Sequence, residues 1–205
     1  MGKVKIKKKS VWIDMTPMSD VMVLLLTFFM LTATFTKNEA VKVNTPGSVS
    51  EIKVPEKNVL NILIDKQGKV FLGMDRPSSQ RTFVDAMAGQ YGVQLNALQM
   101  ETAQGTTNVG VPMEELSKLF SMEPAEINGY QAEKGIPTDS VEGGPSEFQN
   151  WVMAASNNFG QDMKISIKAD SDTPYKVMKK VMSEMQDISE DRYYLITTLK
   201  TGEEL

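Results

Sequence analysis

The sequence predicts a single N-terminal transmembrane helix followed by an α+β domain with a small mixed sheet. Residues 15–35 are predominantly apolar, and at about 1.5 Å per residue a helix of this length spans roughly the 30 Å hydrocarbon core of a bilayer. Residues 1–10 hold five lysines and no acid. From Asn58 onward, short alternating apolar patterns are separated by longer helical ones, which is typical of an α+β domain.

The chain divides into four predicted segments. They are a basic cytoplasmic tail (1–14), a transmembrane helix (15–36), a linker (37–57) and an extracytoplasmic α+β domain (58–205). The lysines before the apolar segment place the N-terminus in the cytoplasm by the positive-inside rule. Within the domain, residues 92–145 are rich in Gly, Pro, Asn and acids, and we interpret them as an inserted subregion with loops and one short helix.

A cleaved signal peptide is the main alternative for the apolar segment, because a basic start and a short apolar run are typical of one. Signal peptides prefer Ala-x-Ala before the cleavage site, whereas here Ala33 stands between two threonines. Asp14, Pro17 and Asp20 at the start of the apolar run are also atypical of a signal peptide. The sequence therefore favours a retained helix.

Composition excludes several classes of function. Residues 58–205 contain 13 Lys or Arg against 21 Asp or Glu, and this acidic balance argues against nucleic acid as a partner of the domain. The chain has no Cys and no His, which excludes disulfides, Cys or His metal sites and Ser–His or Cys–His catalysis. Without a phosphate-binding loop or paired acids at an enzymatic spacing, the sequence predicts neither an enzyme nor a bound cofactor or metal.

Local patterns predict the elements of the domain. Asn58–Ile64 and Lys69–Gly73 are predicted to form a hairpin. In the linker, Val41 and Val43 alternate with polar residues and predict a short strand that pairs with a partner chain or a sheet edge. The other predicted elements are helices at 79–91, 112–120, 146–159 and 175–186 and strands at 163–169 and 193–199.

One stripe of the apolar segment is polar. On a helical wheel of about 100° per residue, Thr16, Asp20, Thr27 and Thr34 fall within about 60° of one another. A carboxylate in hydrocarbon costs several kcal/mol unless it is paired, hydrated or protonated. Asp20 is therefore the candidate proton-transfer residue, with the three threonines as supporting hydrogen-bonding groups. The alternative is that Asp20, one turn into the helix, is an interfacial cap at the headgroups.

Three stretches of the sequence resemble the ExbD/TolR family. Residues 13–30 are similar to the family pattern I-N-x-T-P-x-x-D-x-x-x-x-L-L-x-x-F-M, although Asp14 stands where the family usually has Asn. Residues 165–178 are similar to the pattern I-x-I-x-A-D-x-x-x-x-Y-x-x-V-M. The linker resembles the motif V-x-V-N-L-P, with Thr45 in place of Leu, through Val41, Val43, Asn44 and Pro46.

The resemblance implies a single-pass protein of the cell inner membrane, with a periplasmic C-terminal domain. Such a protein is a subunit inside an ExbB- or TolQ-like polytopic pentamer and is present as a homodimer. The resemblance also implies that protons flow through Asp20 of this chain and that the energy reaches the outer membrane through a TonB- or TolA-like partner. Residues 92–145 have no counterpart in the short members of the family.

Three functions remain open at this point. The first is an ExbD-like or TolR-like subunit, which drives outer-membrane transport or maintains the envelope. The second is a flagellar-stator-like proton channel subunit, although such a subunit carries a peptidoglycan-binding domain whose length and motifs are missing here. The third is a membrane-anchored binding module in which Asp20 is structural. Asp20→Asn distinguishes the third from the others, because only a proton carrier requires a titratable group.

Overall fold

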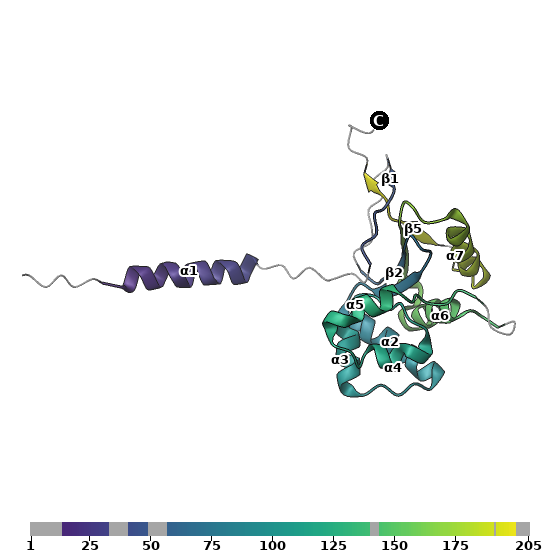
Figure 1. Ribbon diagram of the computed structural model, residues 1–205, viewed down its shortest axis with the longest axis horizontal. Coiled ribbons are helices and arrows are strands. Elements are labelled where there is room, and N and C mark those ends of the chain that lie inside the picture. The colour runs from purple at the N-terminus through teal and green to yellow at the C-terminus, as the bar shows by residue number, and fades with distance from the viewer. Residues whose placement is uncertain (1–13, 33–40, 49–56, 140–143, 191, 200–205) are drawn as a thin grey trace, which may run out of the picture. The chain divides into compact units, whose positions relative to one another are not determined.

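The computed structural model describes residues 14–32, 41–48, 57–139, 144–190 and 192–199 (Figure 1). The chain forms two compact units, Met1–Lys37 and Asn38–Leu205. Each unit is described by itself below.

The described part of the first unit is helix α1, Thr16–Thr32. Its side chains are all exposed, including large apolar ones from Met18 to Leu31. No helix within the described ranges has both the length and the apolar character needed to cross a bilayer, and α1 has 17 residues. The helix predicted over residues 15–36 is thus observed only as α1. It begins one residue later than predicted, and residues 33–36 lie outside the described part of the chain.

The second unit contains a four-stranded sheet of order β3-β2-β4-β5. Strands β2 (Val59–Ile64) and β3 (Val70–Met74) are antiparallel, which confirms the predicted hairpin. Strand β2 is parallel to β4 (Lys164–Ala169), and β4 is parallel to β5 (Tyr193–Leu195), so the small mixed sheet is also confirmed. Gly68 closes the hairpin turn at φ +82°, where a side chain is strained.

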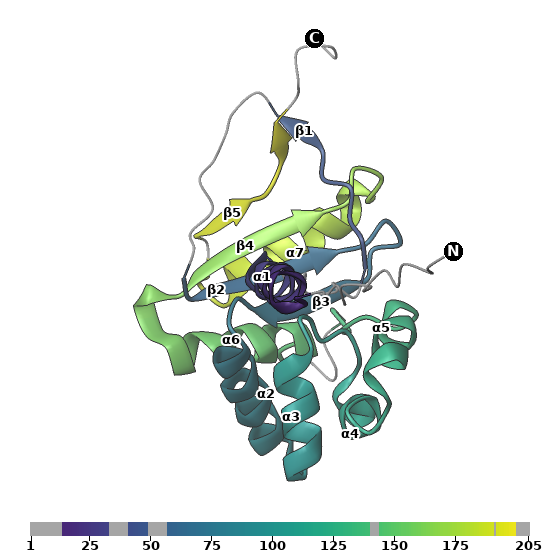
Figure 2. The same ribbon diagram turned by 90° about the vertical axis from the view of Figure 1, so that its left-hand side faces the viewer.

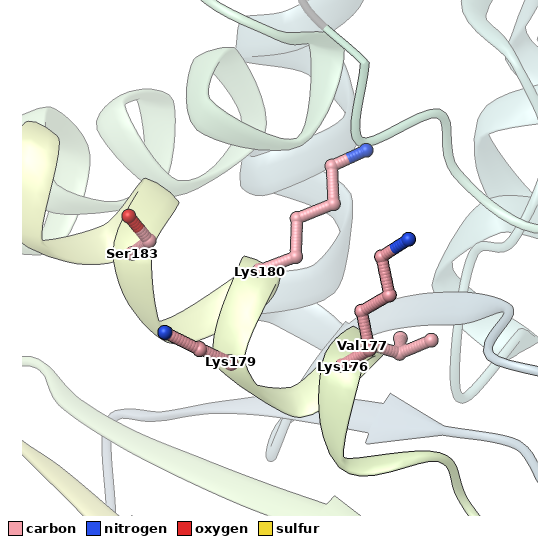
Figure 3. Close-up of a pocket in the computed structure, with 5 residues that line it drawn as sticks. All are labelled: Lys176, Val177, Lys179, Lys180 and Ser183. Atoms are coloured by element: carbon pink, nitrogen blue, oxygen red, sulfur yellow. The ribbon is translucent and has the colours of Figure 1, made fainter.

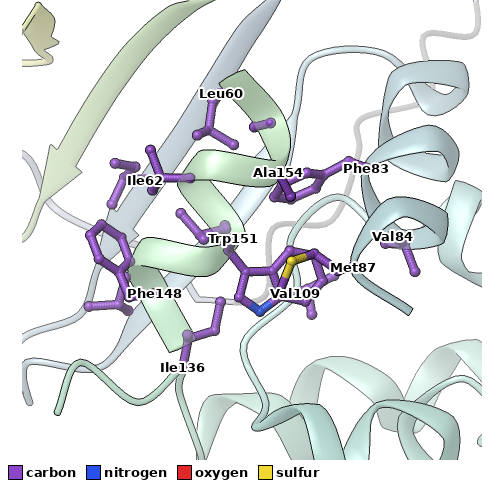
Figure 4. Close-up of a cluster of buried hydrophobic side chains, with 14 of the residues drawn as sticks. Leu60, Ile62, Phe83, Val84, Met87, Val109, Ile136, Phe148, Trp151 and Ala154 are labelled. Atoms are coloured by element: carbon purple, nitrogen blue, oxygen red, sulfur yellow. The ribbon is translucent and has the colours of Figure 1, made fainter. Parts of the chain in front are cut away.

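Three long helices cover one face of this sheet (Figure 2): α2 (Pro77–Tyr91), α6 (Glu147–Phe159) and α7 (Tyr175–Asp187). Figure 4 shows part of the core, where Phe83 of α2 and Trp151 of α6 lie beside Leu60 and Ile62 of β2. The ring centroids of Phe83 and Trp151 are 4.8 Å apart. These side chains are fully buried, and burying each large apolar side chain stabilises the fold by roughly 1.5–3 kcal/mol. The apolar faces predicted for these helices therefore pack against the predicted strands.

Residues 92–145 contain the short helix predicted at 112–120 and two further helices that were not predicted. Four helical elements occupy the region, namely α3 (Ala97–Gly105), η1 (Met113–Glu115), α4 (Leu116–Leu119) and α5 (Pro124–Ala132). Many of its apolar side chains, including Leu116 and Ile127, are buried in the same core as the sheet. The region is therefore an integral part of the fold.

This region also covers the outer edge of strand β3. The backbone N–H of Leu72 donates to the carbonyl of Val109 at 2.8 Å, and the N–H of Val109 donates back at 2.6 Å. The N–H of Ile136 donates to the carbonyl of Val70 at 2.8 Å. Hydrogen bonds that an edge strand otherwise offers to another chain are used within the domain here.

Val41 and Val43, where a short strand was predicted, do not pair with a sheet edge within the described part of this chain. The strand in this part of the chain is β1, Gly47–Ser48, which pairs in parallel with β6, Thr198–Leu199. The final strand predicted over 193–199 is correspondingly divided between β5 and β6, which belong to different sheets. The C-terminal segment thus joins the main sheet to the linker.

Candidate functional site

Asp20 is the acidic residue of helix α1, and its side chain is exposed. Among the described residues, no hydrogen bond or ion pair engages its carboxylate. Its neighbours Val21, Val23 and Leu24 are also exposed, with 57%, 58% and 64% of their surface accessible. A lone carboxylate on an exposed apolar helix requires either water or a protein partner.

The start of α1 is organised by Asp14. Its Oδ1 accepts hydrogen bonds from the backbone N–H of Thr16 at 3.0 Å and from the Thr16 hydroxyl at 2.6 Å. Pro17 lies in the first turn of α1. A backbone N–H in the first turn has no acceptor within the helix, so the N–H that proline lacks costs no hydrogen bond. Asp14 therefore stabilises the helix start, as an Asn at this position also does, and Asp20 lies one turn further into the helix.

The hydroxyls of α1 bond to the helix itself. Thr27 Oγ1 donates to the carbonyl of Leu24 at 2.9 Å, and Thr32 Oγ1 donates to that of Phe28 at 2.8 Å. The Thr16 and Thr27 hydroxyls therefore donate to groups other than Asp20, and Thr34 lies outside the described residues. The hydroxyl oxygens of Thr16 and Thr27 can therefore still accept a hydrogen bond, but their protons are already donated.

The linker motif docks on the turn that follows β4. The backbone N–H of Asn44 donates to Asp170 Oδ2 at 3.0 Å, and the carbonyl of Asn44 accepts from the N–H of Ser171 at 2.8 Å. The other carboxylate oxygen of Asp170 accepts from the N–H of Asp172 at 3.0 Å. These backbone hydrogen bonds, together with the charge of Lys66, hold the pKa of Asp170 below its usual range.

The linker makes a second contact with the C-terminal segment. Thr198 donates its backbone N–H to the carbonyl of Pro46 at 3.1 Å and its hydroxyl to the carbonyl of Thr45 at 2.9 Å. Val41 and Val43 are half-buried. The linker motif and the segment that begins with β4 are thus brought together, although they lie more than 100 residues apart in the sequence.

A cavity of about 350 Å³ lies beside this docked linker. Val41, Lys42 and Asn44 line one side, and the hairpin turn with Asp65 and Lys66 lines another. Within the ranges that the structure describes, no group of three or more acidic side chains is arranged to hold a metal ion.

Two further carboxylates, which the sequence did not single out, lie around the start of α6, where Glu147 is half-buried and Glu184 is buried. Glu147 Oε1 accepts from the backbone N–H of Met113 at 2.8 Å, and burial raises the pKa of Glu147 to about 7. Glu184 of α7 accepts from the Ser146 hydroxyl at 2.5 Å, and burial raises its pKa above the usual range. A capping box formed by Ser146 and Gln149 was the only sequence signal at this site.

The structure thus combines an apolar helix that carries one acid with a small mixed α+β domain. The model of the family of biopolymer transport proteins ExbD/TolR matches residues 7–200, which is nearly the whole chain. No curated protein and no solved structure matches the chain. The chain belongs to the ExbD/TolR family.

Proposed function

We propose that this chain is an ExbD-like subunit of an inner-membrane motor, which couples the proton motive force to TonB-dependent transport across the outer membrane. The N-terminus is cytoplasmic, residues 15–36 form the membrane anchor, and residues 58–205 form the periplasmic domain. The family match and the apolar sequence around α1 support this assignment. The observation that carries it is the exposed carboxylate of Asp20 on an otherwise apolar helix.

In this function Asp20 takes up a proton on one side of the membrane and releases it on the other. One elementary charge that crosses the membrane releases about 2.3 kcal/mol per 100 mV. That free energy is enough to shift a two-state equilibrium by more than tenfold when Asp20 alternates between its charged and neutral forms. Thr16, Thr27 and Thr34 would support the transfer by accepting hydrogen bonds from the protonated carboxyl group of Asp20 or from water.

The exposed side chains of α1 require a partner of matching chemistry. An ExbB/TolQ-like polytopic pentamer can surround the helix with protein and shield Asp20 from lipid. Two copies of this chain inside five identical subunits place their Asp20 side chains inequivalently, so that one is ionised while the other is protonated. Motion of this homodimer would then reach a TonB- or TolA-like protein through the periplasmic domain.

The docked linker is the element through which the two parts of the chain would communicate. Asn44 and Pro46 contact the domain through hydrogen bonds of their own backbone groups, which an extended partner chain could also satisfy. Release of this segment, including Val41 and Val43, would give it a strand to offer to a partner chain. The linker is therefore proposed as a regulatory contact as well as a tether.

The deciding experiment is Asp20→Asn, with Asp14→Asn as the matched control. Both changes remove one carboxylate near the start of α1, but Asp14→Asn restores the residue that the family usually has. We expect Asp20→Asn to assemble with its partners and lose energy-dependent uptake, while Asp14→Asn keeps both. Full uptake with Asp20→Asn would remove the proton-carrier role.

The function that Asp20→Asn abolishes also distinguishes an ExbD-like role from a TolR-like role. An ExbD-like role predicts loss of TonB-dependent uptake, whereas a TolR-like role predicts loss of envelope integrity, measured as sensitivity to detergents. Protease accessibility in spheroplasts and in inverted vesicles tests the proposed topology. A domain that is cleaved only from the cytoplasmic side would contradict it.

A further inference from the structure

The first half of α7 carries a basic face on a domain that is acidic overall. Lys176 and Lys179 are exposed, and Lys180 forms an ion pair with Asp139. The segment from Lys176 to Ser183 contains three lysines and no acid. These lysines line an open groove of about 570 Å³ along the helix. In Figure 3, the side chains of Lys176 and Lys180 extend to one side of α7 and that of Lys179 extends to the other.

This basic face lies at the hairpin end of the domain, which we define as the turn 65–68, the turn 170–174 and the first half of α7. Strands β2 and β4 are parallel, and Ile64 is in register with Ala169, so the turns that follow them lie at the same end. Gly68 in the hairpin turn lies against Val177 of α7. The approach is so close that a Cβ at position 68 would come within 2.8 Å of the Val177 side chain.

The linker enters the domain at this same end. Val41 and Lys42 share a cavity with Lys66 and Gln67 of the hairpin turn, and the hydrogen bonds of Asn44 hold the linker there. Only residues 33–40 separate the last described residue of α1 from Val41. The eight residues 33–40 span at most about 29 Å when fully extended. If the membrane segment ends at residue 36, the four residues 37–40 that remain span at most about 14 Å.

We propose that the hairpin end docks on the anionic lipid headgroups of the same membrane through Lys176 and Lys179 of α7, with Lys66 beside them. This inference rests on the proposed function in one respect, namely that residues 15–36 are the membrane anchor. The docked linker keeps this end of the domain within reach of the bilayer surface. Release of the linker would allow the domain to move away from it.

The charge and the side-chain types at the hairpin end both favour contact with anionic headgroups. A lysine near an anionic membrane surface contributes about 1 kcal/mol of attraction. Asp65 and Asp170 at this end are buried and accept backbone hydrogen bonds, which leaves Asp172 as an exposed acid among the basic residues. Tyr175 is 77% exposed beside Lys176, and tyrosine is enriched at membrane–water interfaces.

The test uses the full chain in lipid nanodiscs. The sequence has no cysteine, so a single Gln67→Cys carries one environment-sensitive fluorophore at the hairpin end. Asn157→Cys in α6 is the reference position at the opposite end, since it is exposed and precedes the start of β4. Quenching by a headgroup-labelled lipid is measured in phosphatidylglycerol mixtures and in pure phosphatidylcholine, each at low and high salt.

Two charge-reversal variants decide the role of the lysines. Lys176→Glu with Lys179→Glu removes the basic face. Lys164→Glu with Arg81→Glu makes the same change in charge at the opposite end, at exposed positions in β4 and α2. We expect quenching at position 67, but not at 157, to depend on anionic lipid. The α7 variant should lower the ratio of docked to free domain on the order of tenfold, and the control variant should not.

Each other outcome overturns the inference. Equal quenching in the two lipids, or equal loss in both variants, shows that the α7 lysines do not recognise anionic headgroups. If the α7 variant loses sedimentation with purified peptidoglycan while its lipid dependence is unchanged, the groove binds cell-wall glycan. A chain that inserts into nanodiscs without docking refutes this inference alone, whereas a chain that fails to insert refutes the membrane anchor as well.

Discussion

Glu147 links the stability of the domain to pH. Its carboxylate lies at the start of α6 and accepts a hydrogen bond from Met113 of the 92–145 region. Burial raises its pKa in the folded state to about 7, from 4.5 when it is exposed. The folded state therefore holds this proton more tightly than the unfolded state. The resulting stabilisation is complete below about pH 4.5 and is lost as the pH rises through 7.

The size of this effect follows from the shift. A change from 4.5 to about 7 corresponds to about 3 kcal/mol for a fully buried group. Glu147 is only half-buried, so solvent screening reduces the expected contribution to about 1–2 kcal/mol. Glu147→Gln keeps an oxygen for the Met113 N–H and removes the charge. We expect the variant to be more stable than the natural chain by about 1–2 kcal/mol at pH 8 and nearly equal at pH 5.

Urea denaturation of the full chain in detergent micelles at pH 5, 6, 7 and 8 measures this difference, with the fluorescence of buried Trp151 as the signal. Glu133→Gln is the matched control, since Glu133 is exposed in the same region and should leave the pH dependence unchanged. Glu184 titrates in the same direction, so part of the pH dependence remains in the variant. An unchanged slope in Glu147→Gln, or a natural chain that gains stability from pH 5 to 8, refutes the reasoning.

Three further substitutions test the linker, the sheet and the membrane helix. Asp170→Ala removes the acceptor for the Asn44 N–H, so we expect faster proteolysis within the linker and a loss of about 1–3 kcal/mol of stability. Gly110→Ala places a Cβ 1.9 Å from the Phe71 ring and should destabilise the domain by about 1–3 kcal/mol in the same urea assay. Thr27→Val keeps the shape of the side chain but removes its hydroxyl, and we expect a partial loss of energy-dependent uptake.

Matched controls exist for two of these changes. Asp187→Ala removes an exposed acid near the end of α7 and should leave linker proteolysis unchanged. Gly129→Ala adds a Cβ inside α5 where nothing lies within 4 Å, and it should stabilise the domain by about 0.5–1 kcal/mol. Equal destabilisation by Gly129→Ala and Gly110→Ala would show that the contact with Phe71 is not the cause.

Local periodicity predicted the regular elements well. The β2–β3 hairpin, α2, α6, β4 and α7 all lie within two residues of their predicted bounds. Each has a clear apolar face or a cap, such as Ser146 before α6, so its local preference and its tertiary environment agree. Helices α3 and α5 were missed because they are nine residues long and each buries few side chains.

The linker could not be predicted in the same way. Alternation at Val41 and Val43 suggested a strand, but the hydrogen-bond partner of Asn44 is the carboxylate of Asp170, 126 residues away. Nothing within the linker specifies that partner. The same holds for the pairing of β1 with Thr198, which divided the predicted final strand in two.

The sequence by itself determined that an apolar helix carries an acid at position 20, because residue type and spacing along one helix are local properties. It also indicated the family through three short motifs, and the match to residues 7–200 shows that family. Only the tertiary structure decided that two of those motifs meet at Asp170, that the 92–145 region covers the edge of β3, and that Glu147 is half-buried. Contacts between distant segments and the burial of a charge depend on how the whole chain packs, which no local pattern contains.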